Sequence, residues 1–134
     1  MRPLTLPLLA PLALLGACAS APGGEYSQPY ALFQAEPRLT QPGYVPAYAL
    51  TIDGKPVRAG QTDPVDPGVR EVEFSVSGPV GNNSKGGTFL KVDAKPCTRY
   101  FFSAKRDSPT ATQWQAFVSN TEPIGECAKR FGLK

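Results

Sequence analysis

The chain has 134 residues, enough for one domain of ordinary size once any leader has been removed. Its 14 basic and 11 acidic residues leave a mild positive charge, which gives no reason to expect a nucleic-acid partner. Histidine is absent, so the chain lacks the usual general base, the usual zinc ligand and the common pH switch.

An apolar run begins soon after Arg2, with the sequence LTLPLLAPLALL. It is too short to cross a bilayer, which takes about 20 apolar residues, and its prolines would interrupt a permanent helix. A positive start, a short apolar core and small residues at its end are typical of a secretory signal peptide. We therefore expect residues 1–17 to be a signal peptide.

The end of this run, Leu15-Gly16-Ala17-Cys18, resembles the lipobox of bacterial lipoproteins. The resemblance implies that Cys18 becomes the first residue and carries acyl chains. Three acyl chains exceed the two signals that stable anchoring requires, so the membrane would be a partner through Cys18. Ala19 is not the Asp that marks retention in the inner membrane, which implies a place at the outer membrane, facing the periplasm.

The next segment, residues 18–47, contains a tether and an extended stretch. Residues 19–29 are small, polar and rich in Pro and Gly, which predicts a flexible tether. Residues 30–47 are more apolar, but the four prolines between positions 29 and 46 exclude a long helix. We expect an extended segment there, able to add an edge strand, ahead of a domain that covers residues 48–134.

From residue 48 onward the sequence alternates short strands with turns. Tyr48, Leu50 and Ile52 would share one face of the first strand, and Asp53-Gly54 is a turn signal. Residues 55–60 (KPVRAG) would return as the next strand, and residues 78–87 are a glycine-rich connection.

Later strands show clearer alternation. Val72, Phe74 and Val76 would face the core, opposite a polar face of Glu71, Glu73 and Ser75, and Leu90 and Val92 would do the same in residues 88–94. Residues 98–105 are apolar on both faces, which predicts a central strand. A further strand would place Trp114, Ala116 and Val118 together, and the tail would make one helical turn.

Five to seven such strands without a long helix predict an all-β fold, a small Ig-like β-sandwich, with a small β-barrel as the alternative. Cys97 and Cys127 remain as an even pair in an exported chain, where oxidising conditions favour a disulfide that closes the domain.

Residues 52–76 resemble the PEGA type of repeat in bacterial envelope proteins, on the basis of Ile52-Asp53-Gly54 and Pro67-Gly68. Residues 96–106 and 123–127 are also similar to uncharacterised proteobacterial lipoproteins with one domain-closing disulfide. Both resemblances imply a non-catalytic envelope module with a PEGA-like or Ig-like sandwich, and neither transfers a catalytic residue.

Two motifs suggest cofactors or metals but lack the necessary spacing. Residues 81–88 (GNNSKGGT) are close to a phosphate-binding loop, yet Gly87 stands where the essential Lys should follow the second Gly. Asp53, Asp63 and Asp66 lack the alternating oxygens and the Glu of a calcium loop, and turn chemistry explains them. We therefore expect no cofactor, no metal and no enzymatic activity.

Basic and aromatic residues gather in the last third of the chain and give the candidate ligand surface: Arg99, Phe101, Lys105 and Arg106. Such a face suits an anionic envelope polymer or a partner protein. The sequence thus predicts a lipid-anchored envelope protein that binds or scaffolds. An inhibitor of a secreted hydrolase, such as lysozyme or a protease, is the alternative.

Overall fold

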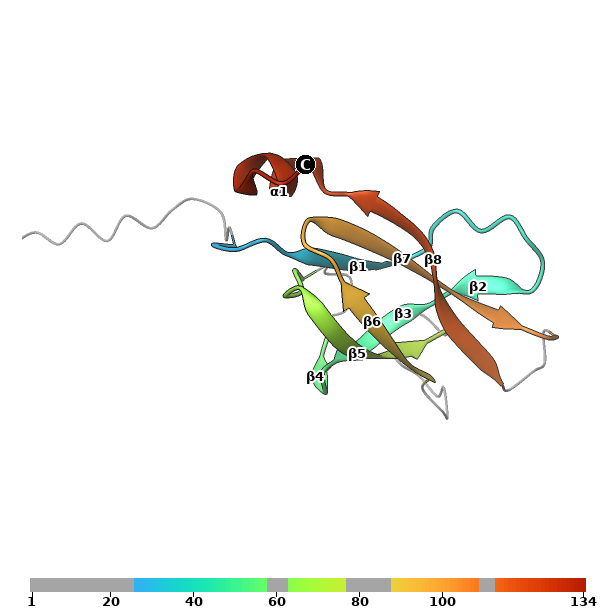
Figure 1. The fold of residues 1–134 in the computed structure, drawn as a ribbon. Coiled ribbons are helices and arrows are strands. Elements are labelled where there is room, and N and C mark those ends of the chain that lie inside the picture. The colour runs from blue at the N-terminus through green and yellow to red at the C-terminus, as the bar shows by residue number, and fades with distance from the viewer. Residues whose placement is uncertain (1–25, 58–62, 77–87, 109–112) are drawn as a thin grey trace, which may run out of the picture.

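The computed structural model describes residues 26–57, 63–76, 88–108 and 113–134. The predicted signal peptide, Cys18, most of the tether and the loop at 81–87 lie outside the described residues. Within them, two four-stranded sheets stack face to face, and one short helix lies at the C-terminus (Figure 1). Both sheets are open, so the fold is the predicted β-sandwich.

Sheet A is built around strand β7 (Thr98–Arg106). Strand β8 (Trp114–Pro123) lies antiparallel along one side of it. The other side is shared by two strands, of which β1 (Ala31–Ala35) runs parallel to the first half of β7 and β2 (Tyr44–Pro46) runs antiparallel to the second half. The central position predicted for residues 98–105 is confirmed.

Sheet B has the strand order β4-β3-β5-β6, with every pair antiparallel. Its strands are β4 (Lys55–Pro56), β3 (Tyr48–Ile52), β5 (Gly68–Ser75) and β6 (Thr88–Ala94). The predicted turn between β3 and β4 is confirmed, because Asp53 and Gly54 have φ values of 50° and 76°. Asp-Gly is the pair that this left-handed hairpin turn favours. The end of the predicted return strand, residues 58–60, lies outside the described residues.

The core between the sheets follows the alternation of the sequence in β5 and β6. Val72, Phe74 and Val92 are buried, and Leu90 packs against them. The rings of Phe74 in sheet B and Phe102 in sheet A lie 4.7 Å apart at their centres, which joins the two layers. Ser75 is also fully buried, although alternation along the strand predicted that it lies on the polar, solvent-facing side with Glu71 and Glu73.

Two β-bulges change which side chains face the core. A register shift between Ala49 and Thr51 turns Ala49 and Ile52 inward, in place of the Tyr48 and Leu50 that simple alternation predicted. A second shift, opposite Phe101 and Phe102, makes Ser119 the extra residue of β8. Trp114 and Ala116, which lie before it, are buried as predicted, whereas Val118 in the same register is 38% exposed. An extra residue in one strand reverses the parity beyond it, and alternation alone does not reveal this.

The segment ahead of residue 48 belongs to the sandwich. Ala31 and Phe33 of β1 and Ala47 after β2 are core residues, and β1 and β2 are edge strands that pair with the central strand β7, as the sequence suggested. The folded unit therefore extends to the N-terminal side of the predicted boundary, because an extended apolar segment completes the open side of β7.

The tail forms helix α1 (Gly125–Phe131), which is longer than the single turn predicted, and Gly132 ends it with φ 64°. The predicted disulfide between Cys97 and Cys127 is present, with the Cα atoms 5.3 Å apart. Cys97, Ile124 and Cys127 form a second small buried cluster, against which Tyr30, Leu32 and Phe131 pack. The bond thus fixes α1 to the start of β7.

Candidate functional site

The ligand surface predicted from the sequence lies mostly on one side of β7. Arg99, Phe101 and Lys105 alternate with the core residues of this strand, so they point away from sheet B. Ser103 lies between them in the same row. We call this side, which carries Arg99, Phe101, Ser103 and Lys105, the outer face of sheet A.

The predicted residues differ in what they offer a ligand. Lys105 is exposed, whereas Arg99 is half-buried, with Nη1 3.8 Å from Oε2 of Glu122. Phe101 is only 8% exposed and therefore does not form the open aromatic surface that the sequence suggested. Arg106 has the opposite parity: it pairs with Trp114, and its N–H donates to the carbonyl of Gly43 at 2.8 Å. Of the four residues, Lys105 is the only exposed one.

A pocket of about 490 Å³ opens on the outer face over Ser103. Register places its walls on both sides of that residue, because β2 pairs with β7 at Pro46 and β8 pairs with it at Phe117. The lining comes from β2, from β8 and from the loop between β1 and β2: Glu36, Arg38, Leu39, Thr40, Gln41, Tyr44, Phe117, Ser119 and Asn120. Sequence reasoning selected none of these as site residues, since only strand pairing brings them together.

The floor of this pocket carries a hydroxyl group. Ser103 is fully buried, and its Oγ has no hydrogen-bond partner among the described residues. Burial of a polar group without a partner costs free energy, which makes such a group a candidate for contact with a ligand. On the wall, the rings of Tyr44 and Phe117 meet edge to face with centres 5.9 Å apart.

Glu36 supplies a fixed carboxylate at the edge of the pocket. Its Oε1 accepts a hydrogen bond of 3.0 Å from the N–H of Arg38, and its Oε2 lies 3.3 Å from Oγ of Ser119. The backbone N–H of Glu36 donates to the carbonyl of Phe102 at 2.9 Å. Hydrogen bonds to both the loop and the sheet thus hold this side of the pocket. Its lining combines one acidic group, the basic side chain of Arg38, several neutral polar groups and two aromatic rings.

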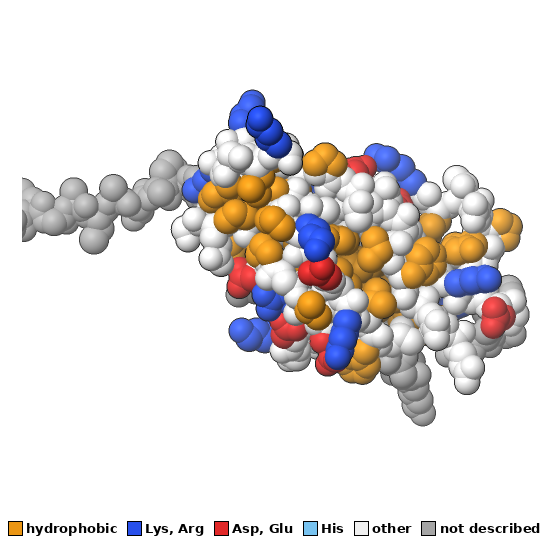
Figure 2. Space-filling view, viewed as in Figure 1, with side chains coloured by type: hydrophobic (Ala, Val, Ile, Leu, Met, Phe, Trp, Pro, Cys, Tyr) orange, Lys and Arg blue, Asp and Glu red, His pale blue; other side chains and the backbone are white. Residues whose placement is uncertain are grey.

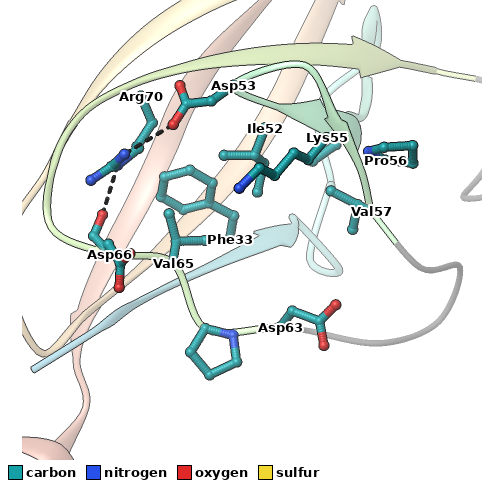
Figure 3. A pocket seen from close by; sticks show the side chains of 12 residues that line it. Phe33, Ile52, Asp53, Lys55, Pro56, Val57, Asp63, Val65, Asp66 and Arg70 are labelled. Carbon is teal, nitrogen blue, oxygen red and sulfur yellow. Dashed lines mark hydrogen bonds and ion pairs between the residues drawn. The ribbon is translucent and has the colours of Figure 1, made fainter. Parts of the chain in front are cut away.

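A second pocket, of about 260 Å³, lies between β1, the β3–β4 hairpin and residues 63–66 (Figure 3). Phe33, Ile52 and Val65 give it an apolar floor. Arg70 lies at its rim and bonds within the protein: Nη1 donates to Oδ2 of Asp53 at 2.9 Å, and Nε donates to the carbonyl of Asp66 at 2.8 Å. Arg70 therefore stabilises two turns at this rim.

Asp53 and Asp66, which the sequence brought up as possible calcium ligands, form hydrogen bonds that stabilise these turns. Oδ1 of Asp53 accepts the N–H of Glu71 at 2.9 Å, and this bond, followed by that from Arg70, holds the pKa of Asp53 below its usual range. Oδ1 of Asp66 accepts a hydrogen bond of 2.9 Å from Nε2 of Gln28. In the part of the chain that the structure describes, no three Cys, Asp or Glu side chains come close enough together to hold a metal ion.

Helix α1 is the one helix among the described residues, and no helix there is long and apolar enough to span a membrane. Comparison of the chain with protein-family models, with curated proteins and with solved structures finds no match.

Proposed function

We propose that this chain is a lipid-anchored, non-catalytic binding protein of the bacterial cell envelope, held at the outer membrane by acyl chains on Cys18. In this proposal it retains a saccharide-containing envelope polymer near the membrane. The observation that supports binding is the pocket on the outer face of sheet A, where the buried hydroxyl of Ser103 has no partner among the described residues.

The chemistry of the pocket suits a sugar. A hexose presents hydroxyl groups around its edge and C–H groups on its faces, so it needs hydrogen-bonding partners together with an aromatic surface. The hydroxyls of Ser103 and Thr40, the amide of Asn120 and the carboxylate of Glu36 are such partners, and Phe117 is half-buried beside them. A shallow pocket with this mixture binds a segment of polymer without enclosing it.

Charge beside the pocket supports an anionic polymer. Lys105 is exposed on the same face and pairs in register with Tyr44, which lines the pocket. The pocket itself holds one acidic and one basic side chain, Glu36 and Arg38, so the accessible ammonium group of Lys105 beside it adds an attraction for a ligand that carries carboxylates or phosphates between its sugars. This attraction is exposed to solvent and therefore weakens at physiological salt.

The anchor is tested by the intact mass of the protein extracted from membranes. We expect loss of residues 1–17 and the added mass of lipid on Cys18. The matched variant Cys18→Ser should leave the membrane fraction when the membranes are washed with 0.5 M NaCl. An unmodified Cys18, or a soluble product from the unaltered chain, contradicts the anchor.

The ligand is tested by co-sedimentation of the detergent-extracted protein with purified cell-wall sacculi. We expect Phe117→Ala and Lys105→Glu to reduce the bound fraction at least about fivefold, the scale of one lost contact of about 1 kcal/mol. Phe89→Ala, an exposed phenylalanine on sheet B, is the control and should bind as the parent does. Equal binding by all variants rejects the pocket. Inhibition of lysozyme or of a protease, without sedimentation, would instead support the inhibitor alternative.

A further inference from the structure

The described chain begins beside helix α1. The rings of Tyr26 and Tyr30 lie 5.6 Å apart at their centres, and Tyr30 packs on the buried cluster of Cys97, Ile124 and Cys127. Figure 1 shows the start of β1 and helix α1 at the same end of the sandwich. A lipid anchor on Cys18 would therefore be connected to the domain at the end where α1 lies.

This end of the molecule carries an excess of positive charge. Lys129 and Arg130 are exposed in the last turn of α1, and Lys134 is exposed beyond it, while Glu126 is the one acidic residue of the helix. Figure 2 shows Lys and Arg side chains gathered over α1, with hydrophobic side chains beneath them. The positive charge of this surface is thus complementary to that of an anionic surface.

Apolar groups accompany these charges. Leu133 is 39% exposed and Tyr26 is 36% exposed, and the guanidinium carbon of Arg130 lies 5.4 Å from the centre of the Phe131 ring. Aromatic and aliphatic side chains mixed with Lys and Arg are characteristic of protein surfaces at the membrane–water interface.

We infer that the α1 end, defined by Tyr26, Lys129, Arg130, Leu133 and Lys134, docks on the headgroups of an anionic phospholipid membrane. The inference rests on the proposed anchor at Cys18. Residues 18–25 can span at most about 28 Å, so an anchored domain cannot move far from the bilayer. Basic residues act on a charged membrane within a Debye length of about 8 Å at physiological salt, and docking brings them within that distance.

Docking at this end also sets the orientation of the pocket. Ser103 lies five residues beyond Thr98 along β7, or about 17 Å farther from α1. The pocket over Ser103 then lies farther from the membrane than α1 does, on the side of sheet A, where a polymer strand is accessible.

The test is lysine acetylation of the membrane-extracted protein, reconstituted in vesicles and read by mass spectrometry. In vesicles with 30 mol% phosphatidylglycerol, labelling of Lys129 and Lys134 should slow several-fold relative to pure phosphatidylcholine, and 0.5 M NaCl should reverse this. Lys55 and Lys91, exposed on sheet B, are controls in the same molecule and should not change. Equal changes at all four lysines, or none, overturn the docking.

A charge-reversal variant separates docking from the anchor. Flotation of the exported Cys18→Ser chain with anionic vesicles should fall at least about tenfold on adding Lys129→Glu and Lys134→Glu, since each basic residue near an anionic surface contributes about fivefold. Lys55→Glu with Lys91→Glu is the matched control. If Cys18 proves unacylated, the unaltered chain replaces the Cys18→Ser chain in the flotation experiment. Salt-sensitive binding that is lost on adding Lys129→Glu and Lys134→Glu still supports docking at the α1 end. If the unaltered chain shows no salt-sensitive binding, docking at the α1 end is rejected.

Discussion

At the scale of single residues, the contact between Asp53 and Arg70 links the turn after β3 to the start of β5. Oδ2 of Asp53 accepts from Arg70, and Oδ1 accepts from the N–H of Glu71. Arg70 also donates to the carbonyls of Asp66 and Pro67. The side chain of Asp53 therefore connects the hairpin turn to β5, through one backbone hydrogen bond and one ion pair.

The depressed pKa of Asp53 predicts an acid-dependent loss of stability. Because its pKa is lower in the folded chain than in the unfolded chain, its contribution is complete above about pH 4 and is lost as the pH falls through the folded value. We expect Asp53→Asn to be less stable than the parent at pH 7 and to lose less stability between pH 5 and pH 2. Urea unfolding at a series of pH values measures this.

Asp63→Asn is the control for that experiment, since Asp63 is exposed and lines the same pocket as Asp53, between β1 and the β3–β4 hairpin. It should follow the pH profile of the parent. A profile for Asp53→Asn that runs parallel to the parent over the whole range would show that Asp53 is not the group responsible.

At the scale of elements, the side chain of Tyr100 fixes the corner between β6 and β7. Its hydroxyl accepts the N–H of Lys95 at 2.8 Å and donates to the carbonyl of Asp93 at 3.1 Å, although the ring is buried between the sheets. A tyrosine near the start of a strand that bonds back to the preceding corner is a recurring device of Ig-like sandwiches.

Removal of this hydroxyl should weaken the corner without creating a cavity. We expect Tyr100→Phe to lower the free energy of unfolding by about 1–2 kcal/mol, because two backbone groups lose their partner. Tyr44→Phe removes a hydroxyl from a half-buried ring on β2 and should change stability by less than about 0.5 kcal/mol. Chemical unfolding followed by fluorescence of the single tryptophan, Trp114, compares the two.

The disulfide is the second connection at this scale, since it joins α1 to the start of β7. Cys97 and Cys127 are 30 residues apart, so removing the bond should cost about 3–4 kcal/mol in the chain-entropy account. We expect the variant with both cysteines changed to alanine to unfold at lower urea. Limited trypsin digestion should cut it first at Lys129 and Arg130. If trypsin cuts at other sites earlier than at Lys129 and Arg130, the helix does not depend on the disulfide.

At the scale of the whole molecule, the sandwich depends on contact between its two sheets. Phe74 and Phe102 are fully buried and meet at the centre of that contact. We expect Phe74→Ala to cost about 3–5 kcal/mol, since it removes a buried ring and leaves a cavity. Phe89→Ala, in which the lost ring is 63% exposed, should cost less than about 1 kcal/mol. Thermal unfolding of the two variants tests this difference.

Sequence patterns determined the local features of this protein. Alternation identified the buried faces of β5 and β6, Asp-Gly marked the hairpin, and apolar residues on both sides of β7 marked it as central. The pair of cysteines that remains beside Cys18, in a chain expected to be exported, predicted the disulfide. Each of these depends on neighbours in sequence or on residue chemistry, which a single chain displays directly.

Tertiary structure alone decided the register and the pocket. The bulges in β3 and β8 reverse side-chain parity where an extra residue is inserted, and nothing in their composition marks the position. Ser103 became a candidate site because β2 and β8 pair on opposite sides of β7 and place Tyr44 and Phe117 around it. Pairing between strands far apart in sequence depends on the packing of the whole core, so the sequence could predict that Arg99, Phe101 and Lys105 share one side of β7 but neither which of them is exposed nor the pocket that lies beside them.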